Sequence, residues 1–95
     1  MLFETVDEMA LNLATRFKKI RKIKNITQKD LSLRSNVSYG TIKRFETTGE
    51  ISLYSLIKLC VALDMPYEVT NMFKELPFKD INEVIKYGKE SRCIL

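Results

Sequence analysis

Apolar residues recur along the chain at intervals of three and four, which is the spacing of one face of an α-helix. Met9, Leu13, Phe17 and Ile20 follow this spacing and predict a helix from about residue 7 to residue 24. No segment alternates apolar and polar residues in the way that a half-buried β-strand does. The pattern therefore predicts an all-α protein.

Five further helices are expected, and polar side chains mark where most of them begin. Thr27, Ser38 and Ser52 each precede an apolar pattern, where an oxygen can accept a hydrogen bond from a free backbone N–H group of the first turn. Asp30 lies three residues after Thr27, as in a capping box. Asn36, which tolerates a left-handed backbone, should end the second helix. The expected ranges are 27–35, 38–47, 52–65, 67–74 and about 80–88.

Pro77 interrupts the chain after the fifth helix. We therefore expect a five-helix domain of residues 1–75, followed by a short extension of residues 76–95 that contains the last helix and a tail. The spacing of three and four also predicts which side chains of the later helices are buried. They are Leu53, Leu56, Ile57, Cys60 and Leu63 in the fourth helix and Val69, Met72 and Phe73 in the fifth.

Charge is distributed unevenly, with a strongly basic segment between two acidic ones. Residues 16–44 contain ten lysines and arginines and a single acid, Asp30, which gives a net charge of +9. Residues 1–15 carry a net charge of −3, and residues 45–95 carry −2. A basic block of this kind is typical of a surface that binds a polyanion such as nucleic acid. A solvated lysine-rich helix face is the alternative.

The composition argues against an enzyme. The chain contains no histidine, the commonest general base and metal ligand, and no serine, cysteine or carboxylate pair has a suitable partner beside it. Cys60 and Cys93 are too few and too isolated for a disulfide framework or a zinc site. We therefore expect no catalysis, no metal and no cofactor. Without a long apolar run or a signal-peptide pattern, we expect a cytoplasmic protein that does not enter a membrane.

The helix predicted over residues 38–47 has an outward face of unusual composition. With Ile42 and Phe45 taken as the inward direction, a rotation of about 100° per residue places Gly40 and Arg44 furthest from the core. Glycine costs about 1 kcal/mol relative to alanine inside a helix. We therefore expect Gly40 to let the backbone approach a bound polyanion closely. The same rotation places Thr41 and Lys43 beside the outward pair, Tyr39 at the boundary and Glu46 back toward the interior.

The chain resembles the lambda-repressor-like (Cro/repressor, Xre) family of DNA-binding domains in three segments. Residues 13–31 read LATRFKKIRKIKNITQKDL, residues 36–46 read NVSYGTIKRFE, and residues 51–65 read ISLYSLIKLCVALDM. The resemblance implies a helix-turn-helix motif over residues 28–47, whose second helix lies in the major groove. Two positions depart from the family pattern: Ser32 stands where alanine is usual, and Asn36 where glycine is usual.

The resemblance and side-chain chemistry together imply which residues read bases. Arg44 can bond guanine O6 and N7 with both arms of its guanidinium group, or contact phosphate alone. Thr41 can bond a base or place its methyl group against thymine. Tyr39 matches a position that often reads bases, but its hydroxyl group can instead bond a phosphate.

Four further residues are implied to support DNA binding. In the family, the glutamine at the position of Gln28 bonds a phosphate and braces the reading side chains; a plain exposed glutamine is the alternative. Lys29 and Lys43 should contact phosphates, which positions the protein without reading sequence. Ser38 mainly caps its helix and can share its hydroxyl group with phosphate.

One basic residue is implied to face the interior instead of DNA. Arg21 matches a family position whose arginine pairs with the glutamate that ends the recognition helix, here Glu46. The inward direction of Glu46 agrees with this pairing. We therefore expect an ion pair between Arg21 and Glu46 that joins the first and third helices.

The resemblance also implies partners. Members of the family usually act as twofold dimers on two half-sites about 34 Å apart. We expect a dimeric repressor of a double-stranded DNA operator, which dimerises through the end of the fifth helix or the extension; the extension can alternatively fold back on its own core. Residues 43–65 together with PFKDINEVIKY at 77–87 also resemble HipB-type antitoxins, regulators that accompany HipA-like kinase toxins. Neutralising such a toxin is the alternative function, and a helical adaptor without DNA is a third.

Overall fold

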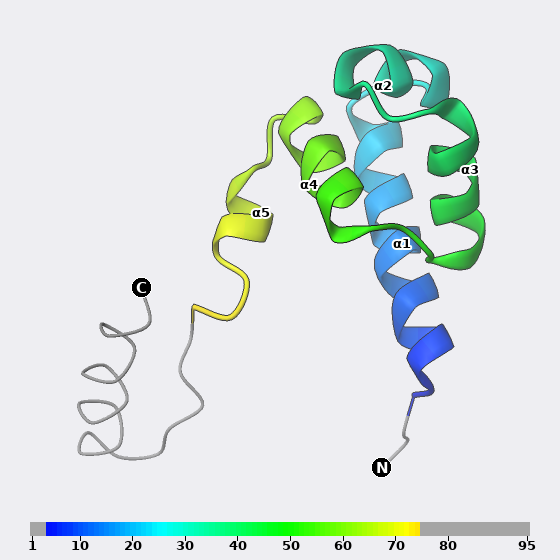
Figure 1. Cartoon of the computed structure of the whole chain (residues 1–95), viewed down its shortest axis with the longest axis vertical. Helices are drawn as coiled ribbons and strands as arrows, with labels where there is room; N and C mark the ends of the chain where they lie inside the picture. Colours follow the sequence, from blue (N-terminus) through cyan, green and yellow to red (C-terminus); the bar gives the residue numbers. More distant parts are fainter. Residues whose placement is uncertain (1–3, 75–95) are drawn as a thin grey trace.

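The computed structural model describes residues 4–74 of the chain as a set of α-helices. No strand occurs within this range, so the prediction of an all-α protein is confirmed. None of the helices in the described range is long and apolar enough to span a bilayer. The predicted extension of residues 76–95, with its helix at about 80–88, lies outside the described residues. The helices are α1 (Val6–Ile23), α2 (Gln28–Ser35), α3 (Tyr39–Thr48), α4 (Leu53–Ala62) and α5 (Tyr67–Thr70) (Figure 1).

Side-chain caps fix where the helices begin. Thr27, Ser38 and Ser52 each accept a hydrogen bond from the backbone N–H group three residues later, as the sequence predicts. The cap of α1 was not predicted. There the hydroxyl group of Thr5 accepts a hydrogen bond from the backbone N–H group of Glu8. In return, the carboxylate of Glu8 accepts one from the backbone N–H group of Thr5. The hydrogen bond from the Thr5 N–H group, with a further contribution from the Thr5 side chain, stabilises the charged carboxylate and lowers the pKa of Glu8.

Two serines hold the turn between α2 and α3. Asn36 ends α2 with a left-handed φ of 60°, as predicted, and the buried side chain of Val37 fills the turn. The Ser32 hydroxyl group donates to the Val37 carbonyl oxygen at 2.6 Å, and the Ser35 hydroxyl group accepts from the Val37 N–H group at 3.1 Å. The backbone polar groups of Val37 are therefore paired. Both departures from the family pattern are compatible with the turn.

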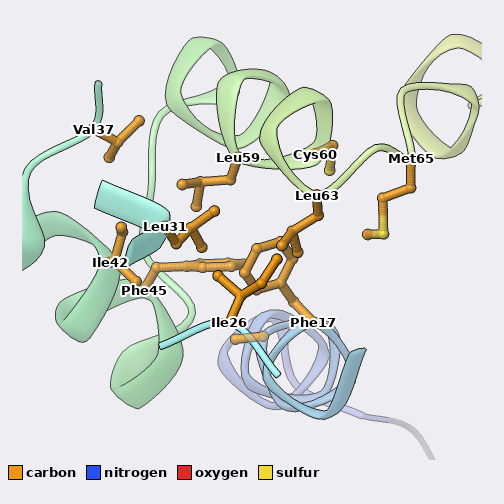
Figure 2. Close-up of a cluster of buried hydrophobic side chains, with 11 residues drawn as sticks. Phe17, Ile26, Leu31, Val37, Ile42, Phe45, Leu59, Cys60, Leu63 and Met65 are labelled. Atoms are coloured by element: carbon orange, nitrogen blue, oxygen red, sulfur yellow. The ribbon is translucent and has the colours of Figure 1, made fainter. Parts of the chain in front are cut away.

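The core lies where α1, α2, α3 and α4 meet (Figure 2). Phe17 of α1 and Phe45 of α3 pack edge to face with ring centroids 5.3 Å apart, which suits the charge distribution of aromatic rings. Leu31, Ile42 and Leu59 are fully buried beside them. The helix-turn-helix pair α2 and α3 is thus held from behind by α1 and α4.

The predicted buried face of α1 is partly wrong. Met9 and Leu13 are exposed, whereas Ala14, Phe17 and Arg21 are buried. Apolar residues occur on more than one face of this helix, and its first turns extend past α3 and α4 (Figure 1). Packing rather than composition therefore selects which face is buried.

The later helices also differ from their predicted patterns. In α4, Leu53 and Ile57 are exposed, while Leu59, which the sequence pattern omitted, is fully buried. The helix α5 ends at Thr70 rather than near residue 74. Beyond it Phe73 adopts a left-handed φ of 64° and is 90% exposed, and Met72 is exposed as well. Only Val69 of the three predicted apolar residues packs against the core.

Candidate nucleic-acid interface

The two faces of α3 differ sharply in composition. Ile42 and Phe45 point into the core, and Glu46 is 7% exposed. No exposed acidic residue lies on α3, because Glu46 is its single acid. The outward face is therefore polar and basic, as the helical rotation predicts. Its exposed or partly exposed members are Tyr39, Gly40, Thr41, Lys43, Arg44, Thr47 and Thr48.

Tyr39 lies between two lysines at the start of α3. The Nζ atom of Lys43 lies 5.2 Å from the centre of the tyrosine ring, and that of Lys29 from α2 lies 5.8 Å from it. The ring attracts both ammonium groups through its negative face. A shallow depression lies beside Tyr39 and Lys29, bordered by Thr27, Gln28 and Arg21. The arrangement concentrates positive charge and a phenol group where α2 and α3 both begin.

The hydroxyl group of Ser38 is occupied within the protein. It accepts from the Thr41 backbone N–H group at 3.1 Å and shares a 2.7 Å hydrogen bond with the Thr41 hydroxyl group. Thr41, which is partly buried, therefore has a hydroxyl group that is already oriented. Ser38 acts as a helix cap here, which is its main predicted role.

Arg21 and Glu46 form a buried ion pair with two parallel hydrogen bonds. The Nε and Nη2 atoms of Arg21 donate to the two carboxylate oxygens of Glu46 at 2.7 and 2.8 Å. The Nη1 atom of Arg21 donates to the carbonyl oxygen of Ile26 at 2.8 Å. Each charged group is thus desolvated but has hydrogen-bond partners, as a buried ion pair requires. The pair joins α1 to α3 in the way that the sequence analysis expects.

Gln28 contributes a third group to this buried pair. Its Nε2 atom donates to the Oε1 atom of Glu46 at 2.9 Å, and its side chain is partly buried. The start of α2 is therefore tied to the same carboxylate as α1. The sequence pattern did not predict this bond, since the two residues are eighteen positions apart.

The exposed side chain of Arg44 contacts an acid beyond the end of α3. Its Nη2 atom donates to the Oε1 atom of Glu50 at 3.0 Å, and the two side chains are 67% and 65% exposed. Residues 48–50 lie between the helices predicted over 38–47 and 52–65, and this contact was not predicted. Gly49 is typical of the residue after a helix and is the signal that could have located the end of α3 just before Glu50.

The two glycines near α3 have different environments. A Cβ atom added at Gly40 would have nothing within 4 Å, so its surface is open. Gly49 instead has φ of 87°, and an added Cβ would lie 2.6 Å from the backbone of Ala10. Gly49 is therefore required by the fold. Packing among residues 4–74 gives no reason for glycine at position 40.

The family model described as helix-turn-helix matches residues 17–69, which is more than half of the chain. The matched range contains α2 and α3, the core residues behind them, and the buried pair of Arg21 and Glu46. No curated protein matches the chain.

Proposed function

The chain belongs to the Cro/C1-type helix-turn-helix family of DNA-binding regulators, and from this premise we propose that it is a dimeric repressor that places α3 in the major groove of its operator. The observation that carries the proposal is the outward face of α3, which is basic and polar and has no exposed acid. A recognition helix of this family meets the edges of the bases with its N-terminal residues.

Arg44 is the residue we propose for direct base recognition. Its guanidinium group is exposed, and it can bond O6 and N7 of guanine at the same time. Such a contact contributes about 1–3 kcal/mol of discrimination against other bases. Thr41 would contact a neighbouring base through its methyl group, because its hydroxyl group already bonds Ser38.

Phosphate contacts are proposed for the residues around the start of the two helices. Lys29 and Lys43 bring two ammonium groups to the ring of Tyr39, which supports a phosphate contact for the tyrosine hydroxyl group. Gln28 would hold the start of α2 in place through its bond to Glu46, and the rest of its amide group would contact the DNA backbone. Contacts of this type position the protein and give affinity that falls with salt.

Gly40 is proposed to set how closely α3 approaches the DNA. Within residues 4–74 an added Cβ would have no atom within 4 Å, which supports a role for this glycine in contact with a partner. A helix without a side chain at this position can bring its backbone nearer to bases or sugars.

Dimerisation is proposed from the exposed apolar side chains of α4 and of the segment after α5. Leu53, Tyr54, Ile57 and Val61 on α4 are all exposed, as is Phe73 after α5. Apolar surface of this kind is typical of a protein interface. A twofold dimer would present two copies of α3 to half-sites about 34 Å apart. Sedimentation equilibrium of the full chain measures the mass of the assembly directly.

The decisive experiment is selection of bound sequences from a random pool of duplex DNA, followed by affinity measurements by fluorescence anisotropy. We expect a palindrome with half-sites one helical turn apart. Arg44→Ala should relax the preference at one base pair of each half-site and cost about 1–3 kcal/mol per site. Lys43→Ala should weaken binding to all sequences and reduce the salt slope by about 0.9 per lost phosphate contact.

Lys74→Ala is the matched control for these variants. It removes the same charge from an exposed position after α5 and should leave the affinity and the preference unchanged. If no sequence is enriched, and if binding to any duplex has a salt slope near zero, the proposal of a sequence-specific DNA-binding protein is wrong. The non-DNA adaptor would then be favoured.

Binding of a HipA-like kinase toxin is the second proposed function. The exposed apolar stripe of α4 supports a protein partner as well as it supports a second copy of this chain. Co-purification of the chain with a kinase encoded beside it, at a fixed stoichiometry and with loss of kinase activity, would establish the antitoxin role. A neighbouring kinase that neither binds nor is inhibited would exclude it.

A further inference from the structure

Glu50 places a negative charge beside the side chain we propose to read DNA. Its carboxylate accepts a hydrogen bond from Arg44 at 3.0 Å, and both side chains are largely exposed. Thr41, Arg44 and Glu50 together border a shallow depression next to the start of α4. An acid at this position opposes the phosphate backbone that α3 must approach.

The fold fixes Glu50 at this place through its backbone. The Thr48 hydroxyl group donates to the carbonyl oxygen of Arg44 at 2.8 Å and accepts from the N–H group of Glu50 at 3.1 Å. One side chain therefore connects the backbone of both members of the pair. Gly49 between them takes a left-handed conformation that packs directly against Ala10 of α1. The loop therefore fixes the backbone of Glu50 within reach of Arg44.

We propose that Glu50 determines the specificity of DNA binding by retaining Arg44 whenever no guanine is available to replace it. The inference rests on the proposed function, since it needs α3 to meet DNA. On a site with guanine at the correct position, Arg44 exchanges the carboxylate for O6 and N7. On any other sequence Arg44 stays with Glu50 and does not contact a phosphate.

The strengths of the contacts that Arg44 can make with Glu50, guanine and phosphate decide which partner it selects. An exposed ion pair changes an equilibrium by about 1.5- to 5-fold, because both groups are well hydrated. A bidentate contact to guanine contributes about 5- to 150-fold and therefore displaces Glu50. A single contact between Arg44 and a phosphate resembles an exposed ion pair in strength, so Glu50 competes with it effectively. Glu50 thus lowers affinity for the wrong sequences more than for the right one.

The test compares Glu50→Gln with the wild-type chain on two duplexes. One duplex contains only A·T pairs and therefore offers no guanine, and the other is the sequence recovered by selection. We expect the variant to bind the A·T duplex about 3-fold more tightly, with a salt slope steeper by about 0.9 for each added phosphate contact. Binding to the selected sequence should change by less, so the ratio of the two affinities should fall.

Two further variants separate this role from a general effect of charge. Glu68→Gln removes the same charge from an exposed position on α5 and should leave both affinities near wild type. In an Arg44→Ala background, Glu50→Gln should tighten binding to the A·T duplex much less, because only the direct repulsion between the carboxylate and the phosphates then remains. An equal gain on both duplexes, a gain that is undiminished without Arg44, or a gain matched by Glu68→Gln would overturn the inference.

Failure of the inference and failure of the proposed function give different results. If the wild-type chain binds duplex DNA with the expected salt dependence but Glu50→Gln changes nothing, only the role of Glu50 is wrong. If neither protein binds either duplex, the proposed function itself is wrong. Thermal unfolding of each variant checks that the fold is retained, and an exposed pair should shift the midpoint little.

Discussion

Replacing Glu46 with alanine should be among the most destabilising single changes in the protein. The side chain of Glu46 is 2% exposed and that of Arg21 is 7% exposed, so the variant leaves a guanidinium group buried without its charge partner. Removal of one member of a buried ion pair costs about 3–5 kcal/mol. For a domain of this size, 1 kcal/mol corresponds to about 4–8 °C in the unfolding midpoint. Glu46→Ala should therefore lower the midpoint by about 12 °C or more.

The hydrogen bonds predict how a glutamine at this position would behave. The Oε1 atom of Glu46 accepts from Arg21 and Gln28, and a glutamine carbonyl can retain both bonds. The Oε2 atom accepts from Nε of Arg21 at 2.7 Å. In Glu46→Gln the amide group there would place a donor against a donor, and the charge is lost as well. We expect its stability to lie between those of the wild type and of Glu46→Ala.

Calorimetry and urea unfolding of the full chain measure these changes. Glu50→Ala is the matched control, since it removes an acid from an exposed ion pair with arginine and should cost at most about 1 kcal/mol. Arg21→Met combined with Glu46→Leu should recover part of the loss, because no buried charge then lacks its partner. If Glu46→Ala were as stable as Glu50→Ala, the buried pair would not hold α1 to α3, and the reasoning would be refuted.

Three other changes give distinct expected outcomes. Gly40→Ala should raise the unfolding free energy by up to about 1 kcal/mol, because the added Cβ meets no protein atom, and should weaken or redirect DNA binding; unchanged binding would remove its proposed role. Gly49→Ala should lower stability by more than 1–2 kcal/mol, since a left-handed backbone and contact with Ala10 both oppose a Cβ, and an unchanged midpoint would contradict this. Burial, with a smaller contribution from the charge of Glu68, raises the pKa of the Cys60 thiol. In a Cys93→Ser variant, Cys60 should therefore react with a thiol reagent much more slowly in the folded protein than in urea; equal rates would show that it is accessible.

The sequence could predict most helix boundaries because their signals are local. The caps at Thr27, Ser38 and Ser52 and the left-handed Asn36 follow from side chains that act within three or four residues. The buried faces were harder to predict. Apolar residues cover several faces of α1 and α4, so the periodicity alone did not exclude Leu53 or identify Leu59. Only tertiary packing distinguishes between these faces.

The candidate site likewise has features that the sequence could predict and contacts that it could not. Rotation about the α3 axis was enough to place Gly40 and Arg44 outward and Glu46 inward, because all three lie on one regular helix. The bond from Gln28 to Glu46 and the contact of Arg44 with Glu50 depend on how α2 and the loop after α3 are placed. Such contacts between elements cannot be derived from helix periodicity.

The residues that stabilise α3 and the residues proposed to bind DNA lie on opposite faces of the helix. Ile42, Phe45 and Glu46 fix α3 against the core, while Gly40 and Arg44 have no packing role that the structure shows. Substitutions on the outward face should therefore change affinity or sequence preference with little change in stability. Gly40 inside the helix reduces stability when considered alone, and Glu50 beside the arginine proposed to read bases reduces affinity for DNA. Their presence is explained if the outward face is shaped by discrimination between DNA sequences, which rewards close fit and penalises contacts that every sequence can make.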